Sequence, residues 1–139
     1  MRGALRGSLR RVNSGERGSV TLGLAVVFPA CLALVLLVVE AALVFHARDI
    51  AQAAAQEGLR QARLYDGSAI GGQRRAEDFL AQTGGGDLLD GSEVLVSRDG
   101  ESVRVEVRGH ALSLLPGLRP TVAAVAAGPV ERFVPAGAP

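Results

Sequence analysis

The sequence predicts an α+β fold in which a long N-terminal helix crosses a membrane and continues beyond it, followed by a short helix and a small antiparallel sheet. Three observations predict it. An uncharged apolar run extends from Ser19 to Val39, small residues then recur at helical spacing, and alternating valines follow residue 93. We expect three parts: a basic cytoplasmic leader over residues 1–18, the transmembrane and extended helix over residues 19–66, and a small extracytoplasmic α+β domain over residues 67–139.

The apolar run is long enough to cross a bilayer. Its 21 residues carry no charge, and as a helix they would extend roughly 32 Å, against a hydrocarbon core of about 30 Å. No comparable basic cluster follows the run closely, whereas five arginines precede it: Arg2, Arg6, Arg10, Arg11 and Arg17. The positive-inside rule therefore predicts a single-pass protein of the cell membrane with a cytoplasmic N-terminus.

Two other interpretations of the run stay open. A cleaved secretory signal peptide also has a basic start, but its apolar stretch is usually about 7–15 residues, and no clean cleavage site closes this one. A generic single-pass anchor needs length and apolar character alone. The role of Cys31 is open as well, because a single cysteine cannot form an intramolecular disulfide and this one fits a small apolar residue.

Beyond Glu40, which falls at the expected outer interface, the helix continues with a stripe of small residues on one face. The members of this stripe are Ala47, Ala51, Ala55, Gly58 and Ala62. Small residues let another backbone approach closely. The stripe packs either against the chain's own globular part or against a neighbouring subunit. Asp66 and Gly67 are expected to end the helix, with Gly67 as a left-handed cap.

The part after residue 67 predicts a short helix and three strands. Gly71 and Gly72 open the helix, and the triple glycine 84–86 ends it as a linker. A hairpin follows with Asp99–Gly100 at its turn, and a third strand begins near Thr121. The valines expected on the buried face of the sheet are Val94, Val96, Val103, Val105 and Val107.

Composition argues against two classes of function. The net charge is +1, tryptophan is absent and aromatic residues make up 4% of the chain, so nucleic-acid binding is not expected. The two histidines, His46 and His110, lie far apart without metal-ligand spacing, and no convincing Ser/His/Asp set is present. We therefore expect a protein that is not an enzyme, with no catalytic, cofactor-binding or metal site.

A long N-terminal helix, half in the membrane and half outside, followed by a small antiparallel sheet resembles the plan of type IV pilins. The stretch from Glu16 to Arg63 further resembles the TadE-like family, pseudopilin-like proteins of the Tad (Flp) pilus and secretion apparatus. The resemblance rests on the basic-glycine junction before the run, the Phe28–Pro29 step and the alanine-rich continuation. It implies partners among pseudopilins and platform proteins, together with a prepilin peptidase.

The resemblance also implies a processing site. Cleavage by the peptidase would follow Gly18 and leave Ser19 as the new N-terminus. The family pattern usually has Glu at the fifth position after the cut, where this chain has Gly23. A glutamate there is costly in hydrocarbon and is normally kept for a partner, such as the amine of a neighbouring subunit. Whether this chain is cleaved, and whether it enters a filament or assists assembly, therefore stays open.

Two classes of function follow. The first is a non-enzymatic accessory of pilus assembly or secretion that acts through helix packing in the membrane. The second is an unrelated single-pass envelope protein with a small external binding domain, or a secreted domain released by signal peptidase. Neither the stoichiometry nor the individual partner follows from the sequence.

Overall fold

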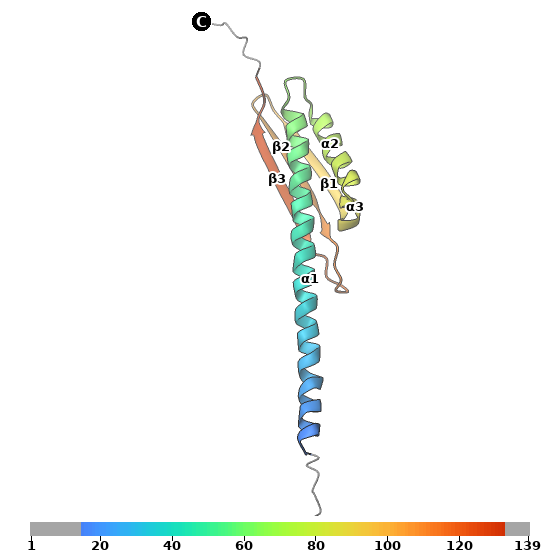
Figure 1. Ribbon diagram of the computed structural model, residues 1–139. Helices are drawn as coiled ribbons and strands as arrows, with labels where there is room; N and C mark the ends of the chain where they lie inside the picture. Colours follow the sequence, from blue (N-terminus) through green and yellow to red (C-terminus); the bar gives the residue numbers. More distant parts are fainter. Residues whose placement is uncertain (1–14, 133–139) are drawn as a thin grey trace, which may run out of the picture. The chain divides into compact units, whose positions relative to one another are not determined.

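The computed structural model describes the backbone of residues 15–132 and the side chains of residues 23–132. The chain divides into two compact units, residues 1–36 and residues 37–139, which are described separately. The order of elements is a long helix, two short helices and three strands (Figure 1), which confirms the predicted α+β arrangement. The elements are α1 (Gly15–Arg63), α2 (Ala69–Gln82), α3 (Gly85–Leu88), β1 (Leu89–Arg98), β2 (Ser102–Ala111) and β3 (Thr121–Pro129).

The described part of the first unit is the N-terminal portion of α1. Pro29 lies inside the helix. From residue 23 to residue 36 every described side chain is exposed, including Cys31 and large apolar residues such as Phe28. One stretch of α1 is long and apolar enough to cross a membrane, and it is a candidate span by length and composition. The leader arginines lie outside the residues whose side chains the structure describes.

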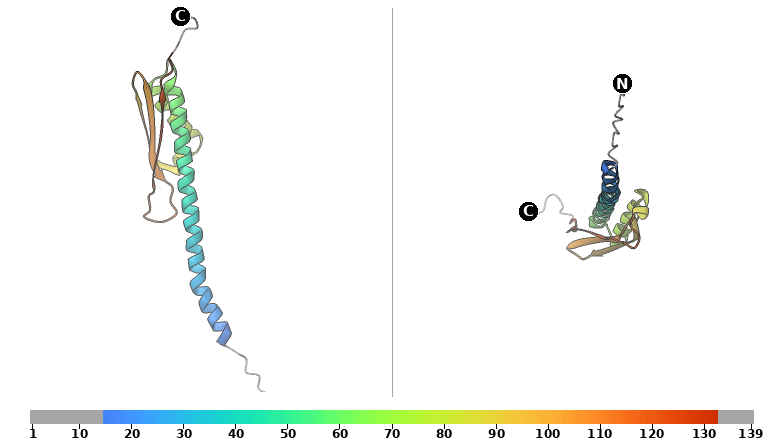
Figure 2. Two further views of the ribbon diagram at one scale, coloured as in Figure 1. Left: turned by 90° about the vertical axis from the view of Figure 1, so that its left-hand side faces the viewer. Right: turned by 90° about the horizontal axis from the view of Figure 1, so that it is seen from below.

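The second unit is a three-stranded antiparallel sheet covered on one face by helices. The strand order is β1-β2-β3, and Figure 2 shows the sheet edge-on beside α1. Val94 lies opposite Val107 and Val96 opposite Val105, so the alternating valines of β1 and β2 share a face. This agrees with the predicted hairpin and with the third strand near Thr121. β1 also begins at Leu89, before the predicted alternation, with a register irregularity between Asp90 and Glu93.

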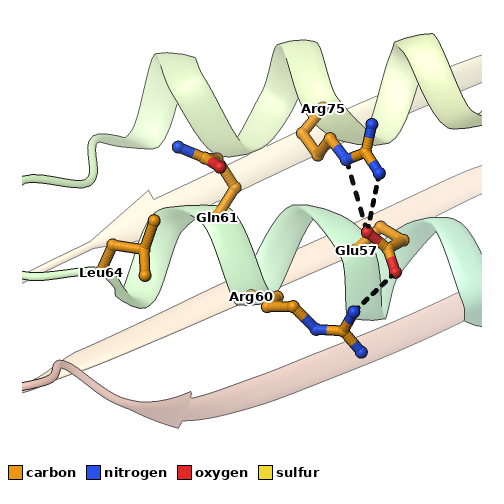
Figure 3. A pocket seen from close by; sticks show the side chains of 5 residues that line it. All are labelled: Glu57, Arg60, Gln61, Leu64 and Arg75. Carbon is orange, nitrogen blue, oxygen red and sulfur yellow. Dashed lines mark hydrogen bonds and ion pairs between the residues drawn. The ribbon is translucent and has the colours of Figure 1, made fainter.

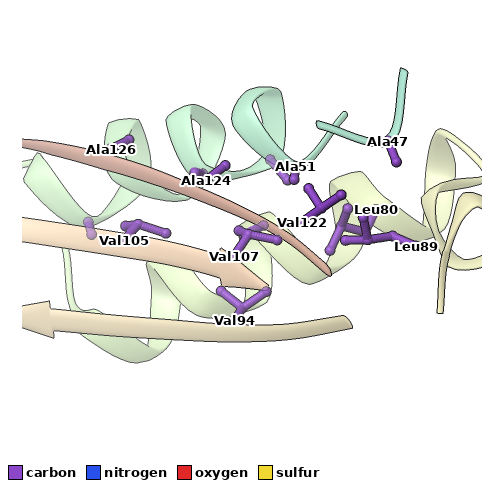
Figure 4. Close-up of a cluster of buried hydrophobic side chains, with 14 of the residues drawn as sticks. Ala47, Ala51, Leu80, Leu89, Val94, Val105, Val107, Val122, Ala124 and Ala126 are labelled. Carbon is purple, nitrogen blue, oxygen red and sulfur yellow. The ribbon is translucent and has the colours of Figure 1, made fainter. Parts of the chain in front are cut away.

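The core lies between this face of the sheet and the helices (Figure 4). Val103, Val105 and Val107 of β2 are fully buried, and Val94 is nearly so. Most of the remaining core residues are alanines, and their small size brings helix and sheet backbones close together. The alanines are Ala47, Ala51, Ala54, Ala55, Ala62 and Ala76 from the helices, with Ala111, Ala124 and Ala126 from the strands.

The end of α1 differs from the prediction. The helix stops at Arg63, and Gly67 is not among the glycines with positive φ, so the left-handed cap expected there was wrong. Residues distant in the sequence bind this end of the chain instead: the Glu131 N–H, after β3, donates to the Arg63 carbonyl at 2.9 Å. Arg98 of β1 donates to the carbonyl of Leu64, the residue after the helix, at 3.3 Å. Gly67 is needed for space, because a Cβ there would lie 2.5 Å from the Gln61 carbonyl oxygen.

The second helix begins earlier than predicted. Ser68 is its N-cap, and the Ser68 hydroxyl accepts a hydrogen bond from the Gly71 N–H at 3.0 Å. Gly71 and Gly72 therefore lie inside the helix and do not open it. The triple glycine is likewise more than a linker: Gly84 has a φ of 68° and reverses the chain, and Gly85 begins the short helix α3.

Candidate functional site

The small-residue stripe of α1 is covered by the chain's own residues. Ala47, Ala51, Ala55 and Ala62 have no exposed surface, and they belong to one apolar cluster with the valines of the sheet. The sequence leaves open whether this face packs against the chain's own globular part or against a neighbouring subunit. In the structure it packs against the chain's own globular part. Ala54, which was not among the predicted stripe residues, is also fully buried.

Two glycines define the closest approach of α1 and α2. A Cβ added to Gly58 would lie 2.9 Å from the Gly72 carbonyl oxygen, and one added to Gly72 would lie 2.6 Å from the Ala62 Cβ. Real Cβ atoms do not approach that closely. The stripe residue Gly58 therefore contacts Gly72 of α2. The spacing of the stripe alone does not predict this contact.

An open hollow of about 460 Å³ lies beside this crossing (Figure 3). Its polar groups pair with one another: Glu57 Oε1 accepts from Arg60 at 3.1 Å, and Glu57 Oε2 accepts from Arg75 at 3.2 Å. Arg75 and Arg60 are substantially exposed, and exposed ion pairs contribute little stability. The hollow therefore has the character of a surface link between two helices, in which one carboxylate is shared by two arginines.

A buried carboxyl group is the second unusual feature. The Glu40 side chain lies in the second unit and is 6% exposed. Glu40 Oε2 accepts a hydrogen bond from the Leu114 N–H at 3.0 Å, whereas Glu40 Oε1 has no hydrogen-bond partner among the described residues. Buried polar atoms without a partner are rare, and each indicates a structural or functional demand.

The sequence carried a signal for this burial that the prediction did not use. Glu40 lies seven residues before Ala47, which is two helical turns, so it continues the buried stripe. The prediction placed Glu40 at the outer interface on charge alone. Its hydrogen-bond donor, the Leu114 N–H, lies in the connection between β2 and β3, far along the chain, and helical spacing does not reveal this contact.

The predicted processing residues lie at the start of α1. Gly18 and Ser19 are helical, but they precede the residues whose side chains are described. Gly23 is described and exposed, and a Cβ added there would meet nothing within 4 Å. The space around Gly23 therefore admits a side chain.

A comparison with protein families gives one match. Residues 18–60 match the family model described as TadE-like protein. This segment is about a third of the chain and includes the apolar run and the small-residue stripe as far as Gly58. Comparisons with curated proteins and with solved structures gave no match. The family match confirms the resemblance that the sequence indicates: residues 18–60, within α1, are similar to the TadE-like family.

Proposed function

We propose that this chain is a non-enzymatic, membrane-anchored, pseudopilin-like accessory subunit of a Tad/Flp-type pilus assembly or secretion apparatus. α1 crosses the cell membrane once, with the N-terminus in the cytoplasm and the sheet domain outside. The observation that carries the proposal is the family match, because it falls on the candidate membrane span and on the helix that continues from it. A TadE-like segment indicates a protein associated with Tad pili.

The distribution of exposed residues on α1 supports contacts inside the membrane. The small-residue stripe packs against the chain's own sheet. Large apolar residues in the run are exposed, among them Leu24, Phe28 and Val35. We expect pseudopilins and platform proteins of the apparatus to contact these exposed residues, because they give the span an open apolar surface.

A deletion strain tests this function. Removing the gene should abolish assembly of Tad pili or secretion by the apparatus, and the full chain supplied in trans should restore it. A matched chain with Val35→Arg should be present in the membrane in smaller amounts or fail to restore assembly, because a charge inside the span is costly. Normal assembly in the deletion strain would contradict the proposed function.

Processing by a prepilin peptidase belongs to the same proposal. Mass spectrometry of the membrane-extracted protein should find Ser19 at the mature N-terminus, and Gly18→Leu should abolish this product. An intact leader in cells with an active peptidase would contradict processing.

The companion variant Gly23→Glu tests the missing glutamate, and the open space at Gly23 means that it does not disturb packing within the chain. Its insertion cost is at most about 2.5–3.5 kcal/mol. Improved assembly beside a subunit with a free amine, or reduced insertion without one, is expected. No change in either would show that position 23 carries no information about assembly.

A further inference from the structure

The connection between β2 and β3, residues 112–120, displays large apolar side chains on the surface; we name it the leucine loop. Leu112, Leu114, Leu115 and Leu118 are between 36% and 53% exposed. Large apolar residues scattered singly over a surface are ordinary, whereas several on one loop mark contact with an apolar partner. The leucine loop is therefore a surface that requires an explanation.

The loop is held in one shape by its own hydrogen bonds. Leu118 N–H donates to the Leu115 carbonyl at 3.2 Å, and Gly117 between them has a φ of 83°. With Pro116 before it, this is a type II turn, which needs glycine at its third position. The Ser113 hydroxyl accepts from the Leu115 N–H at 3.2 Å. A hydrogen-bonded turn therefore holds the leucines in the loop.

The buried carboxyl of Glu40 fixes where this turn lies along α1. Leu114 N–H donates to Glu40 Oε2 at 3.0 Å, and Figure 1 shows the loop beside α1, beyond the ends of the strands. Glu40 is the first charged residue after the apolar run. The hydrogen bond therefore holds the leucine loop at the level of α1 where the apolar run ends.

The apolar surface of the loop continues on α1. Leu37, Val38 and Val39, directly before Glu40, are 64%, 62% and 39% exposed. Arg119 follows the last leucine, and it is exposed and paired with Asp90 at 2.8 Å. Leucines next to exposed charged side chains form an arrangement that suits the boundary between acyl chains and headgroups.

We propose that the leucine loop inserts into the outer interfacial layer of the bilayer that α1 spans, and that Glu40 is the latch that holds it there. The partner is a lipid surface. The chain then contacts its membrane at two places, which fixes the sheet domain against the bilayer. This proposal rests on the membrane anchoring in the proposed function.

Tryptophan fluorescence tests the loop and the anchor separately, because the natural chain has no tryptophan. The full chain is reconstituted into phosphatidylcholine–phosphatidylglycerol vesicles whose acyl chains are brominated near the headgroup end. Leu115→Trp reports the loop and Leu34→Trp reports the span. Leu95→Trp, a partly exposed position in β1, is the control in the sheet, outside both the loop and the span. Leu118→Trp repeats the loop measurement from the other side of the turn.

The loop variants should lose emission in brominated vesicles relative to unbrominated ones, and their emission should shift to shorter wavelength. Leu95→Trp should keep its emission. Quenching at Leu34→Trp without quenching at either loop position would overturn the loop proposal while leaving the anchor intact. Absence of quenching at Leu34→Trp would overturn the anchor and, with it, the loop. A blue-shifted but unquenched loop tryptophan would show that protein covers the loop, which also overturns the proposal.

The latch is tested in the Leu115→Trp chain. Glu40→Ala removes the acceptor for the Leu114 N–H and should reduce quenching of the loop tryptophan. Glu40→Gln keeps an acceptor oxygen and should retain most of it. Quenching in the Glu40→Ala chain equal to that in the chain that keeps Glu40 would show that Glu40 does not hold the loop.

Discussion

At the scale of single residues, Gly58 and Gly72 let α1 and α2 touch through their backbones. Gly72→Ala would place a methyl group 2.6 Å from the Ala62 Cβ, so the helices must separate. Overpacking of this kind costs about 1–3 kcal/mol. We expect a corresponding loss in the free energy of unfolding of the full chain in detergent, measured by chemical denaturation.

Gly86→Ala is the matched control, because a Cβ there meets nothing within 4 Å. It should change the stability by less than about 1 kcal/mol, in the stabilising direction. Equal effects of the two substitutions would show that the glycine crossing does not limit helix packing.

Asp99 gives the hairpin turn a dependence on pH. Its carboxylate accepts from the Glu101 N–H at 2.8 Å and the Ser102 N–H at 2.6 Å. These backbone hydrogen bonds, first that from Glu101, lower the pKa of Asp99 below its ordinary value. The stabilisation is therefore present above the unfolded pKa, about 3.9, and is lost as pH falls through the folded value.

The acid dependence of the melting temperature checks this prediction. Asp99→Asn keeps an acceptor oxygen but does not titrate, so its melting temperature should fall less than that of the natural chain as the pH drops below about 4. The other acidic residues titrate in both proteins and cancel in the comparison. Parallel pH profiles would contradict the role of the Asp99 carboxylate.

At the scale of elements, the sheet depends on the face that its valines share. Val105 is fully buried in β2, and a carboxylate there would lie in the core without a partner, at a cost of several kcal/mol. Val105→Asp should therefore unfold the domain outside the membrane. Val125→Asp, on the partly exposed face of β3, should leave it folded. Amide hydrogen exchange in the full chain distinguishes a folded from an unfolded domain. Unchanged protection in Val105→Asp would show that Val105 does not lie on the buried face of the sheet.

The sequence was sufficient for elements whose pattern is local. The alternating valines predicted the hairpin, because a period of two residues fixes which face is buried. The end of α1 could not be predicted in the same way, because Glu131, distant in the sequence, donates to the carbonyl of its last residue, Arg63. The predicted start of α2 was too late because Gly71 and Gly72 were expected to open the helix, whereas the Ser68 cap sets the boundary.

The candidate site likewise has a part that a local pattern predicts and a part that depends on distant contacts. Helical spacing grouped the small residues of α1, because neighbours on one helix face are set by the chain itself. The burial of Glu40 depends on Leu114, 74 residues away, and no local pattern reveals that contact. Gly18 and Ser19 stay predictions from the family resemblance.

At the scale of the whole molecule, the positive-inside rule predicts the orientation in the membrane. An alkaline phosphatase fused after Pro139 should be active, because the enzyme folds outside the cytoplasm, and the same enzyme fused before Met1 should be inactive. The reverse pattern of activities would contradict the predicted topology. Inactivity at both ends, with both fusions present in full length, would contradict a single crossing.

The contact between the exposed apolar part of α1 and subunits of a Tad-type apparatus carries the proposed function. Its most direct measurement is photo-cross-linking in living cells, with p-benzoylphenylalanine at Val35, a position that is 58% exposed. The account predicts adducts that contain pseudopilins or platform proteins of the apparatus, identified by mass spectrometry, and their loss in cells without those genes. Adducts confined to proteins unrelated to the apparatus, or adducts that persist in those cells, would contradict it.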